Sequence, residues 1–204
     1  MRFLITCIAL LLAAGAGAGL DEGVAAYDRR DYATALAEFR PLADKGDASA
    51  QNRLGHMVMQ GQGVARDPAA AVALWRKAAE QRHPTAQFNL SVAYGIGAGV
   101  PRDPAEADRW LRRSAEEGLP AAQNVLASRY AVGLNVEKDE VQAVAWWRKA
   151  ATQGHAASQF ALAEAYRSGK GIAQDDQEAL YWYRQAAGQG NVPAQEALRR
   201  FEKR

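Results

Sequence analysis

The chain has 204 residues, of which 49% are hydrophobic and 24% are charged, a composition that excludes disordered and fibrous proteins. Its 25 lysines and arginines nearly balance 23 acidic residues, and a net charge of +2 gives no reason to expect nucleic acid or an anionic membrane as the main partner. Cys7 is the only cysteine, so a chain that loses its first segment has no thiol for disulfides, nucleophilic catalysis or metal binding.

Residues 1–18 have the pattern of a secretory signal peptide. Arg2 is followed by an uncharged stretch from Phe3 to Ala14 and by a run of small residues that ends at Ala18. We expect cleavage after Ala18 and export of the remaining chain, so that the protein is periplasmic or secreted. An uncleaved membrane anchor stays open as an alternative, although the apolar stretch is shorter than the roughly 20 residues that a spanning helix needs.

A single spacing of 36 residues organises the rest of the chain. Glutamine, leucine and aspartate recur at this spacing without a change of register, in the columns Gln51, Gln87, Gln123, Gln159 and Gln195; Leu54, Leu90, Leu126, Leu162 and Leu198; and Asp67, Asp103, Asp139 and Asp175. The sequence therefore predicts four units, 48–83, 84–119, 120–155 and 156–191, between an N-terminal half-repeat cap at 19–47 and a C-terminal capping helix at 192–204.

Each unit has the pattern of two helices joined by a glycine turn. In the first helix the apolar residues recur at every fourth position, as in Ala50, Leu54 and Val58, which predicts a buried stripe. Glycines at the end of this helix supply positive φ, and Asn135 replaces the second glycine of the turn in the third unit. An aspartate such as Asp67 then predicts the N-cap of the second helix, whose buried face alternates large rings with alanines.

These motifs closely resemble the Sel-one-like repeat family, a branch of the tetratricopeptide-type helical repeats. The resemblance covers about residues 24–200 and is carried by segments such as 87–90 with Tyr94, 97–100 and 147–151. It implies an all-α fold, a right-handed α/α superhelical solenoid of 36-residue helix-turn-helix repeats. It also implies a scaffold or adaptor that binds proteins or peptides, often exported to the bacterial envelope.

Stacked repeats expose an extended concave surface, which favours binding over chemistry. On a helical wheel, the face of the first helix opposite the apolar stripe holds columns that do not repeat, and tetratricopeptide-type arrays line their concavity with this face. We therefore expect the partner-binding residues to be Asn52, His56, Phe88, Val92, Asn124, Ser128, Phe160 and Glu164. An alternative for the two phenylalanines is simple packing between neighbouring first helices.

Three sequence features that could indicate a phosphate, metal or anion site have simpler structural explanations. The glycine-rich run 95–99 follows a helix rather than a strand, so it predicts the repeat turn and not a phosphate loop. His83 and His155 lie two units apart and cannot share a metal, so we expect no metal site and no cofactor. The arginine column Arg76, Arg112, Arg148 and Arg184 is more typical of an outer helix face than of an anion-binding ladder.

The sequence thus favours an exported, non-enzymatic scaffold that binds a protein or peptide partner in the cell envelope. One alternative is a solenoid that binds envelope glycan or peptidoglycan through the arginines and the aromatic-polar inner face. A second alternative follows from the resemblance, because a cysteine-rich subset of the family has been linked to β-lactam hydrolysis. This chain has no cysteine after Cys7, which argues against the hydrolase.

Overall fold

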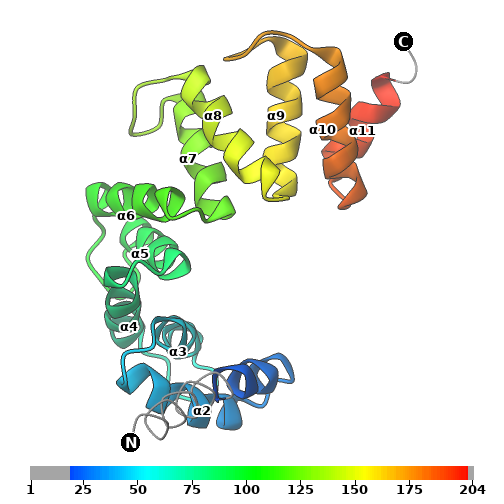
Figure 1. The fold of residues 1–204 in the computed structure, drawn as a ribbon. Helices are drawn as coiled ribbons and strands as arrows, with labels where there is room; N and C mark the ends of the chain where they lie inside the picture. Colours follow the sequence, from blue (N-terminus) through cyan, green and yellow to red (C-terminus); the bar gives the residue numbers. More distant parts are fainter. Residues whose placement is uncertain (1–18, 202–204) are drawn as a thin grey trace, which may run out of the picture. The chain divides into compact units, whose positions relative to one another are not determined.

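The computed structural model describes residues 19–201, and the predicted signal peptide lies outside this range. The chain divides into two compact units, the first ending at Ala107 and the second beginning at Asp108. The described residues are helical, with turns between the helices and no strand. After a helix at 19–28, the helices are α2 (Tyr32–Asp44), α3 (Ala48–Gln60), α4 (Pro68–Glu80), α5 (Pro84–Ile96), α6 (Pro104–Glu116), α7 (Pro120–Val132), α8 (Glu140–Thr152), α9 (Ala156–Ser168), α10 (Asp176–Gly188) and α11 (Val192–Phe201) (Figure 1).

The predicted all-α class of helix-turn-helix repeats is confirmed. Odd-numbered helices from α3 to α9 are the first helices of the four repeats, and even-numbered helices from α4 to α10 are the second. Within each unit, successive helices pack against each other, from α2 to α5 in the first and from α7 to α11 in the second. The segment 19–47, expected to be an N-terminal half-repeat cap, contains the helix at 19–28 followed by α2.

Aspartate N-caps begin the second helices, as the sequence predicts. Asp67 accepts a hydrogen bond from the backbone N–H of Ala70, and Asp103, Asp139 and Asp175 cap α6, α8 and α10 in the same way. Each such cap contributes about 1 kcal/mol to helix stability. The first helices α3, α5, α7 and α9 end at glycines in the left-handed region.

The turn after each first helix requires positive φ at its second glycine position as well. Asn135 has a φ of 58°, which confirms the expectation that asparagine replaces glycine in the third repeat. At Gly171, with a φ of 69°, an added Cβ would collide with the backbone carbonyl of Glu140 at the start of α8. Glycine is therefore needed there both for its conformation and for close approach to the preceding repeat.

The repeated glutamine is a buried clasp between helices. Gln123 is 4% exposed, and its Nε2 donates to the carbonyl of Ala115 at 3.1 Å. Its Oε1 accepts from Nε2 of Gln153 at 2.9 Å, so one amide ties three helices together. Gln51 and Gln159 repeat the arrangement with Gln81 and Gln189. Gln87 donates to the Ala79 carbonyl in the same way, but its buried Oε1 has no hydrogen-bond partner, so the second repeat has only half of this arrangement. A buried amide is costly unless its polar atoms are paired, which is consistent with the complete pairing of Gln51, Gln123 and Gln159.

Candidate functional site

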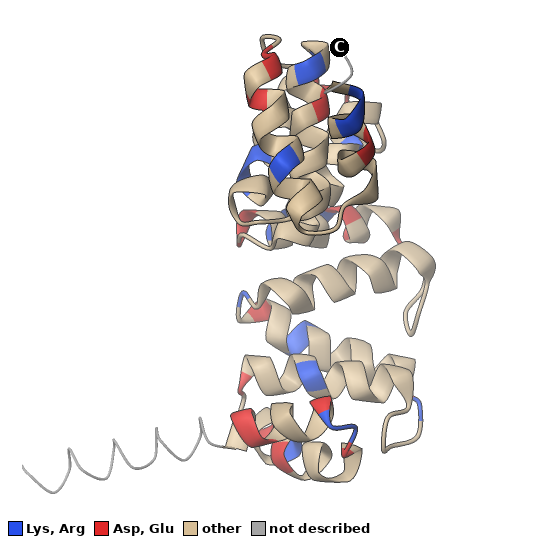
Figure 2. Cartoon of the chain, turned by 90° about the vertical axis from the view of Figure 1, so that its right-hand side faces the viewer, with Lys and Arg blue, Asp and Glu red and all other residues tan. Residues whose placement is uncertain are grey.

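The first helices line four hollows, two within each unit. In the first unit they involve residues 19–28, α3 and α5, with Trp75 from α4. In the second unit they involve α7, α9 and α11, with contributions from the second helices α8 and α10. This is the face that the sequence analysis assigns to binding, because its columns do not take part in the repeat packing. In the cartoon of Figure 2, basic and acidic residues both occur along the helices and turns of the described chain.

The largest of these hollows, the polar groove, has a volume of about 630 Å³ and lies in the first unit. Asn89 Nδ2 donates to Asn52 Oδ1 at 3.0 Å, which joins α5 to α3 across the groove. The hydroxyl of Tyr27 lies 3.2 Å from His56 Nδ1 and donates to Gln62 Oε1 at 3.1 Å. The lining residues are Leu20, Asp21, Val24, Tyr27, Ser49, Asn52, Arg53, His56, His83, Thr85 and Asn89.

Two side chains that line the polar groove, His83 and Arg53, differ in charge and in hydrogen bonding. His83 is the N-cap of α5, and its Nδ1 accepts a hydrogen bond from the Ala86 N–H at 3.2 Å. Burial lowers the pKa of His83 below its ordinary value, which keeps the imidazole uncharged and able to accept. Arg53 on α3 is half-buried, and no described residue forms a hydrogen bond or an ion pair with its guanidinium.

The second hollow of the first unit, the apolar hollow, has a volume of about 390 Å³ and adjoins the polar groove through His56 and Asn89. Val92 and Ile96 lie one turn apart on α5 and are 45% and 72% exposed, so both contribute apolar surface to this hollow. Apolar lining comes from Met59, Trp75, Val92, Ala93, Ile96 and Ala98, and Gln60 and Arg66 complete the rim.

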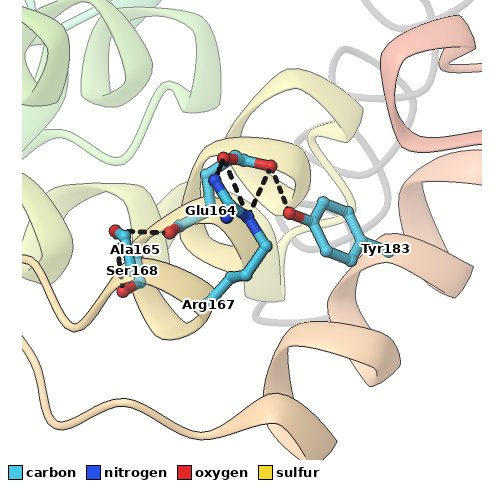
Figure 3. Close-up of polar contacts among 5 residues, drawn as sticks. All are labelled: Glu164, Ala165, Arg167, Ser168 and Tyr183. Atoms are coloured by element: carbon cyan, nitrogen blue, oxygen red, sulfur yellow. Dashed lines mark hydrogen bonds and ion pairs between the residues drawn. The ribbon is translucent and has the colours of Figure 1, made fainter. Parts of the chain in front are cut away.

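A polar cluster occupies the corresponding face of the second unit. Glu164 on α9 accepts hydrogen bonds from Arg167 Nε and Nη2, the latter at 2.6 Å, and from the hydroxyl of Tyr183 on α10 (Figure 3). Burial acts to raise the pKa of Glu164, but these hydrogen bonds and the charges of Arg167 and Arg200 outweigh it and lower the pKa. The carboxylate is thus ionised and already satisfied within the chain.

The two hollows of the second unit lie on either side of this cluster and share Phe160, Glu164 and Arg167. One of about 410 Å³ is floored by Trp147 and alanines, with Lys138 and Lys170 at its rim. The other, of about 360 Å³, is closed by Tyr183 and Phe201. Both have an apolar floor and a charged rim, whereas the polar groove of the first unit has hydrogen-bonding groups along its length.

The eight predicted binding residues are distributed unevenly. Asn52, His56, Val92, Phe160 and Glu164 line the hollows. The residues that do not line these four hollows are Phe88, Asn124 and Ser128. Two of them form hydrogen bonds within the second unit instead: Asn124 Oδ1 accepts from Ser158 Oγ, and Ser128 Oγ donates to the Asn124 carbonyl. Phe160 also packs on the buried Tyr183, with ring centroids 5.9 Å apart, so it serves packing and lining together.

Sequence reasoning missed Arg53, Tyr27 and Asn89 as groove residues. Arg53 lies at about −100° from Leu54 on the helical wheel, at the edge of the sector that was assigned to binding. Its column, which continues as Asn89, Val125 and Ala161, does not repeat, and this variation is the signal that marks it. Tyr27 belongs to the helix at 19–28, which was expected to cap the repeats and not to bind a partner.

The arginine column contacts tyrosines of the following repeat. Arg112 Nη1 donates to the Tyr130 hydroxyl at 3.1 Å, and Arg148 Nη2 donates to the Tyr166 hydroxyl at 3.0 Å. Arg76 donates to Tyr94 in the same way, and each guanidinium lies near the tyrosine ring. Three of the four arginines therefore link repeats instead of presenting a free basic ladder.

The described residues contain no group of three or more histidine, aspartate or glutamate side chains arranged to hold a metal ion. His155, like His83, is an N-cap whose imidazole accepts from the backbone, in this case from the N–H of Ser158. Among the described helices, none combines the length and apolar character that crossing a membrane requires.

The fold defines a helical-repeat protein whose first helices line the hollows described above. A family model described as the Sel1 repeat matches residues 48–83, 84–119, 120–155 and 156–191, and the chain therefore belongs to the Sel1 repeat family. The boundaries agree with the four predicted repeats. Proteins of this family are generally scaffolds for protein–protein interaction and typically are not catalysts.

Solved structures support the same assignment. A Sel1 repeat protein from Oxalobacter formigenes is 34% identical with a TM-score of 0.81, over 82% of this chain and 49% of that one. A protective antigen with an SLR fold, present in uropathogenic Escherichia coli strains, is 36% identical with a TM-score of 0.75, over 90% of this chain and 41% of that one. The chain thus spans about half or less of these relatives. An immunity protein from Pseudomonas aeruginosa, 23% identical with a TM-score of 0.60 over 88% of this chain and 66% of that one, shares the fold. No curated protein matches the chain.

Proposed function

We propose that this chain is an exported, non-enzymatic scaffold that binds a protein or peptide partner in the cell envelope through the face of its first helices. The observation that carries the proposal is the placement of the hollows: in both units they open on this face. Columns that hold the repeats together, such as the glutamine clasp, keep their identity, whereas the columns that line the hollows change from repeat to repeat. That division is typical of a conserved frame with a specialised binding surface.

Binding is tested by crosslinking in cells and recovery of the chain from the envelope fraction. The double variant His56→Ala/Val92→Ser changes two exposed side chains on the binding face, and Lys77→Ala/Glu80→Ala changes two exposed side chains on α4 as the matched control. A defined protein should be recovered with the wild type and the control and lost with the face variant. Equal recovery with all three chains, or no specific protein with any of them, contradicts the proposal.

Export is supported by the sequence of residues 1–18 and has its own test. Cell fractionation combined with mass spectrometry of the intact protein should find a chain that begins at Gly19 outside the cytoplasm. A full-length chain in the membrane fraction would favour the anchor alternative. A full-length chain in the cytoplasm would refute export while leaving the scaffold proposal intact.

The two alternatives have less support. The glycan alternative relied on the arginine column, but Arg76, Arg112 and Arg148 are hydrogen-bonded to tyrosines. The hydrolase alternative relied on cysteine-rich members of the family. A cysteine rich protein B from Helicobacter pylori is 19% identical, with a TM-score of 0.51 over 65% of this chain and 95% of that one, so the likeness concerns the fold alone. Cys7 remains the only cysteine of this chain.

A further inference from the structure

His83 has two roles in the first unit. It is the N-cap of α5, where its Nδ1 accepts a hydrogen bond from the Ala86 N–H at 3.2 Å, and it lines the polar groove. A protonated imidazole carries a hydrogen on both nitrogens, so this Nδ1 can accept only while His83 is uncharged. The protonation state of one groove residue therefore decides whether the first turn of α5 is capped.

The surroundings of His83 hold it uncharged at neutral pH. Burial lowers its pKa, Arg53 on α3 acts in the same direction, and Asp47, the N-cap of α3, acts in the opposite direction. Asp21 of the helix at 19–28 lines the same groove and contributes a negative charge to it. Protonation of His83 would add a second cation to the groove wall that carries Arg53, and this cation would lie at the positive end of the α5 dipole.

His155 is the matching N-cap of α9 in the second unit, but it has an additional partner. Its Nδ1 accepts from the Ser158 N–H at 3.3 Å and lies 2.9 Å from Ser158 Oγ. This Oγ donates its own proton to Asn124 Oδ1 at 2.9 Å, which leaves the oxygen able to accept a hydrogen bond. A protonated His155 can therefore donate from Nδ1 to Ser158 Oγ and keep a partner on α9.

The difference between the two caps lies in one side chain. Ala86 and Ser158 occupy the same position in repeats two apart, and both are fully buried. Asn52 and Asn124 are related in the same way. The first unit thus has the asparagine of this arrangement but a methyl group in place of the hydroxyl, so a protonated His83 finds no oxygen there to which its Nδ1 could donate.

We infer that His83 is a pH-sensitive switch that uncaps α5 and changes the wall of the polar groove when the surroundings of the protein become mildly acidic. At neutral pH the imidazole caps α5. In acid it releases the Ala86 N–H, loosens the first turn that places Thr85 at the groove, and adds positive charge to the wall that carries Arg53. The second unit keeps its cap at α9, so the response is confined to the first unit and is independent of what the groove binds.

The test is NMR spectroscopy of residues 19–204 at pH 7.5 and pH 5, as wild type and as three variants that circular dichroism shows to be folded. Ala86→Ser supplies the missing hydroxyl, Ser158→Ala removes the existing one, and His83→Asn keeps an uncharged N-cap acceptor. Imidazole resonances report the protonation of His83 and His155. Hydrogen exchange, corrected for its intrinsic pH dependence, reports the protection of the backbone amides at positions 86 and 158.

In the wild type, exchange at position 86 should rise about fivefold on acidification, which is the equivalent of one lost N-cap, while exchange at position 158 should change by less than about twofold. Ala86→Ser should reduce the rise at position 86, His83→Asn should remove it, and Ser158→Ala should produce a similar rise at position 158. The inference is overturned if His83 stays uncharged at pH 5, or if its protonation leaves exchange at position 86 unchanged. An equal rise at positions 86 and 158 in the wild type also overturns it.

Discussion

The third repeat lacks an N-cap that the other repeats have, and restoring it should stabilise the second unit. Leu119 occupies the cap position of α7 and makes no side-chain hydrogen bond. Its backbone, with φ −64° and ψ 117°, matches that of Asp47 in the first repeat, with φ −62° and ψ 117°. Because the backbone is already in the capping conformation, Leu119→Asp should place its carboxylate on the Ala122 N–H without rearrangement, as Asp47 does with Ala50 at 2.7 Å.

The expected gain is about 1 kcal/mol relative to Leu119→Ala, because an N-cap acceptor contributes roughly 0.5–2 kcal/mol. Comparison with alanine is essential, since Leu119 is partly buried and its removal has a separate cost. The charge of the aspartate also lies at the positive end of the α7 dipole, which adds in the same direction. For a chain of this size, 1 kcal/mol corresponds to a shift in Tm of about 2–4 °C.

The measurement is urea unfolding followed by circular dichroism, with the midpoint compared at constant slope so that a change in the denatured state is recognised. Asp47→Ala is the reciprocal control and should lose about the same free energy as Leu119→Asp gains over Leu119→Ala. If Leu119→Asp is no more stable than Leu119→Ala while Asp47→Ala is destabilised, the match of the two backbones does not determine the cap, and the reasoning fails.

Three further predictions concern the frame that holds the face in place. Since the folded-state pKa of His83 lies below 6.5, its stability contribution is present above pH 6.5 and is lost as the pH falls toward the folded pKa, so His83→Asn should reduce the urea-midpoint difference between pH 7 and pH 5. Gly171→Ala should destabilise the chain by about 2–4 kcal/mol from its left-handed backbone and collision, against about 1 kcal/mol for Gly154→Ala, which has open space, and thermal melts of both variants measure the contrast. Gln153→Ala should cost about 1–2 kcal/mol in urea titration, because it leaves the buried Gln123 Oε1 without its donor, and no loss of midpoint would disprove the clasp.

The helices and turns of the repeats could be predicted because each repeat has the same kinds of capping and turn residues at the same positions. Asp67 and the aspartates at the same position of the other repeats indicate the start of a helix, and Asn135 indicates a residue with positive φ. Both signals could be interpreted from the sequence because they depend on backbone chemistry within a few residues. The glutamine column was visible in the sequence, but its partners were not. The link from Gln153 to Gln123 joins residues 30 positions apart and exists only once the helices are packed.

The candidate site was predicted less well because its residues depend on what surrounds them. Glu164 is on the expected face, but its carboxylate already accepts hydrogen bonds from Arg167 and Tyr183. It is therefore poorly suited to forming hydrogen bonds with a partner. Arg53 lies at the edge of the same face and has no such partners. A helical wheel gives the direction of a side chain, whereas availability for binding depends on neighbours that come from other helices.

The difference between the two units explains how one repeat can support more than one binding chemistry. The column of Arg53 continues as Val125 and Ala161 in the second unit, while the column of His56 continues as Ser128 and Glu164. Neither column contributes to the glutamine clasp or to the caps, so such substitutions leave the frame intact. The first unit thereby has an unpaired cation beside an apolar hollow, and the second has a paired carboxylate between two hollows. Substitutions at Arg53 and Ile96 should accordingly affect recognition by the first unit without changing the packing of the second.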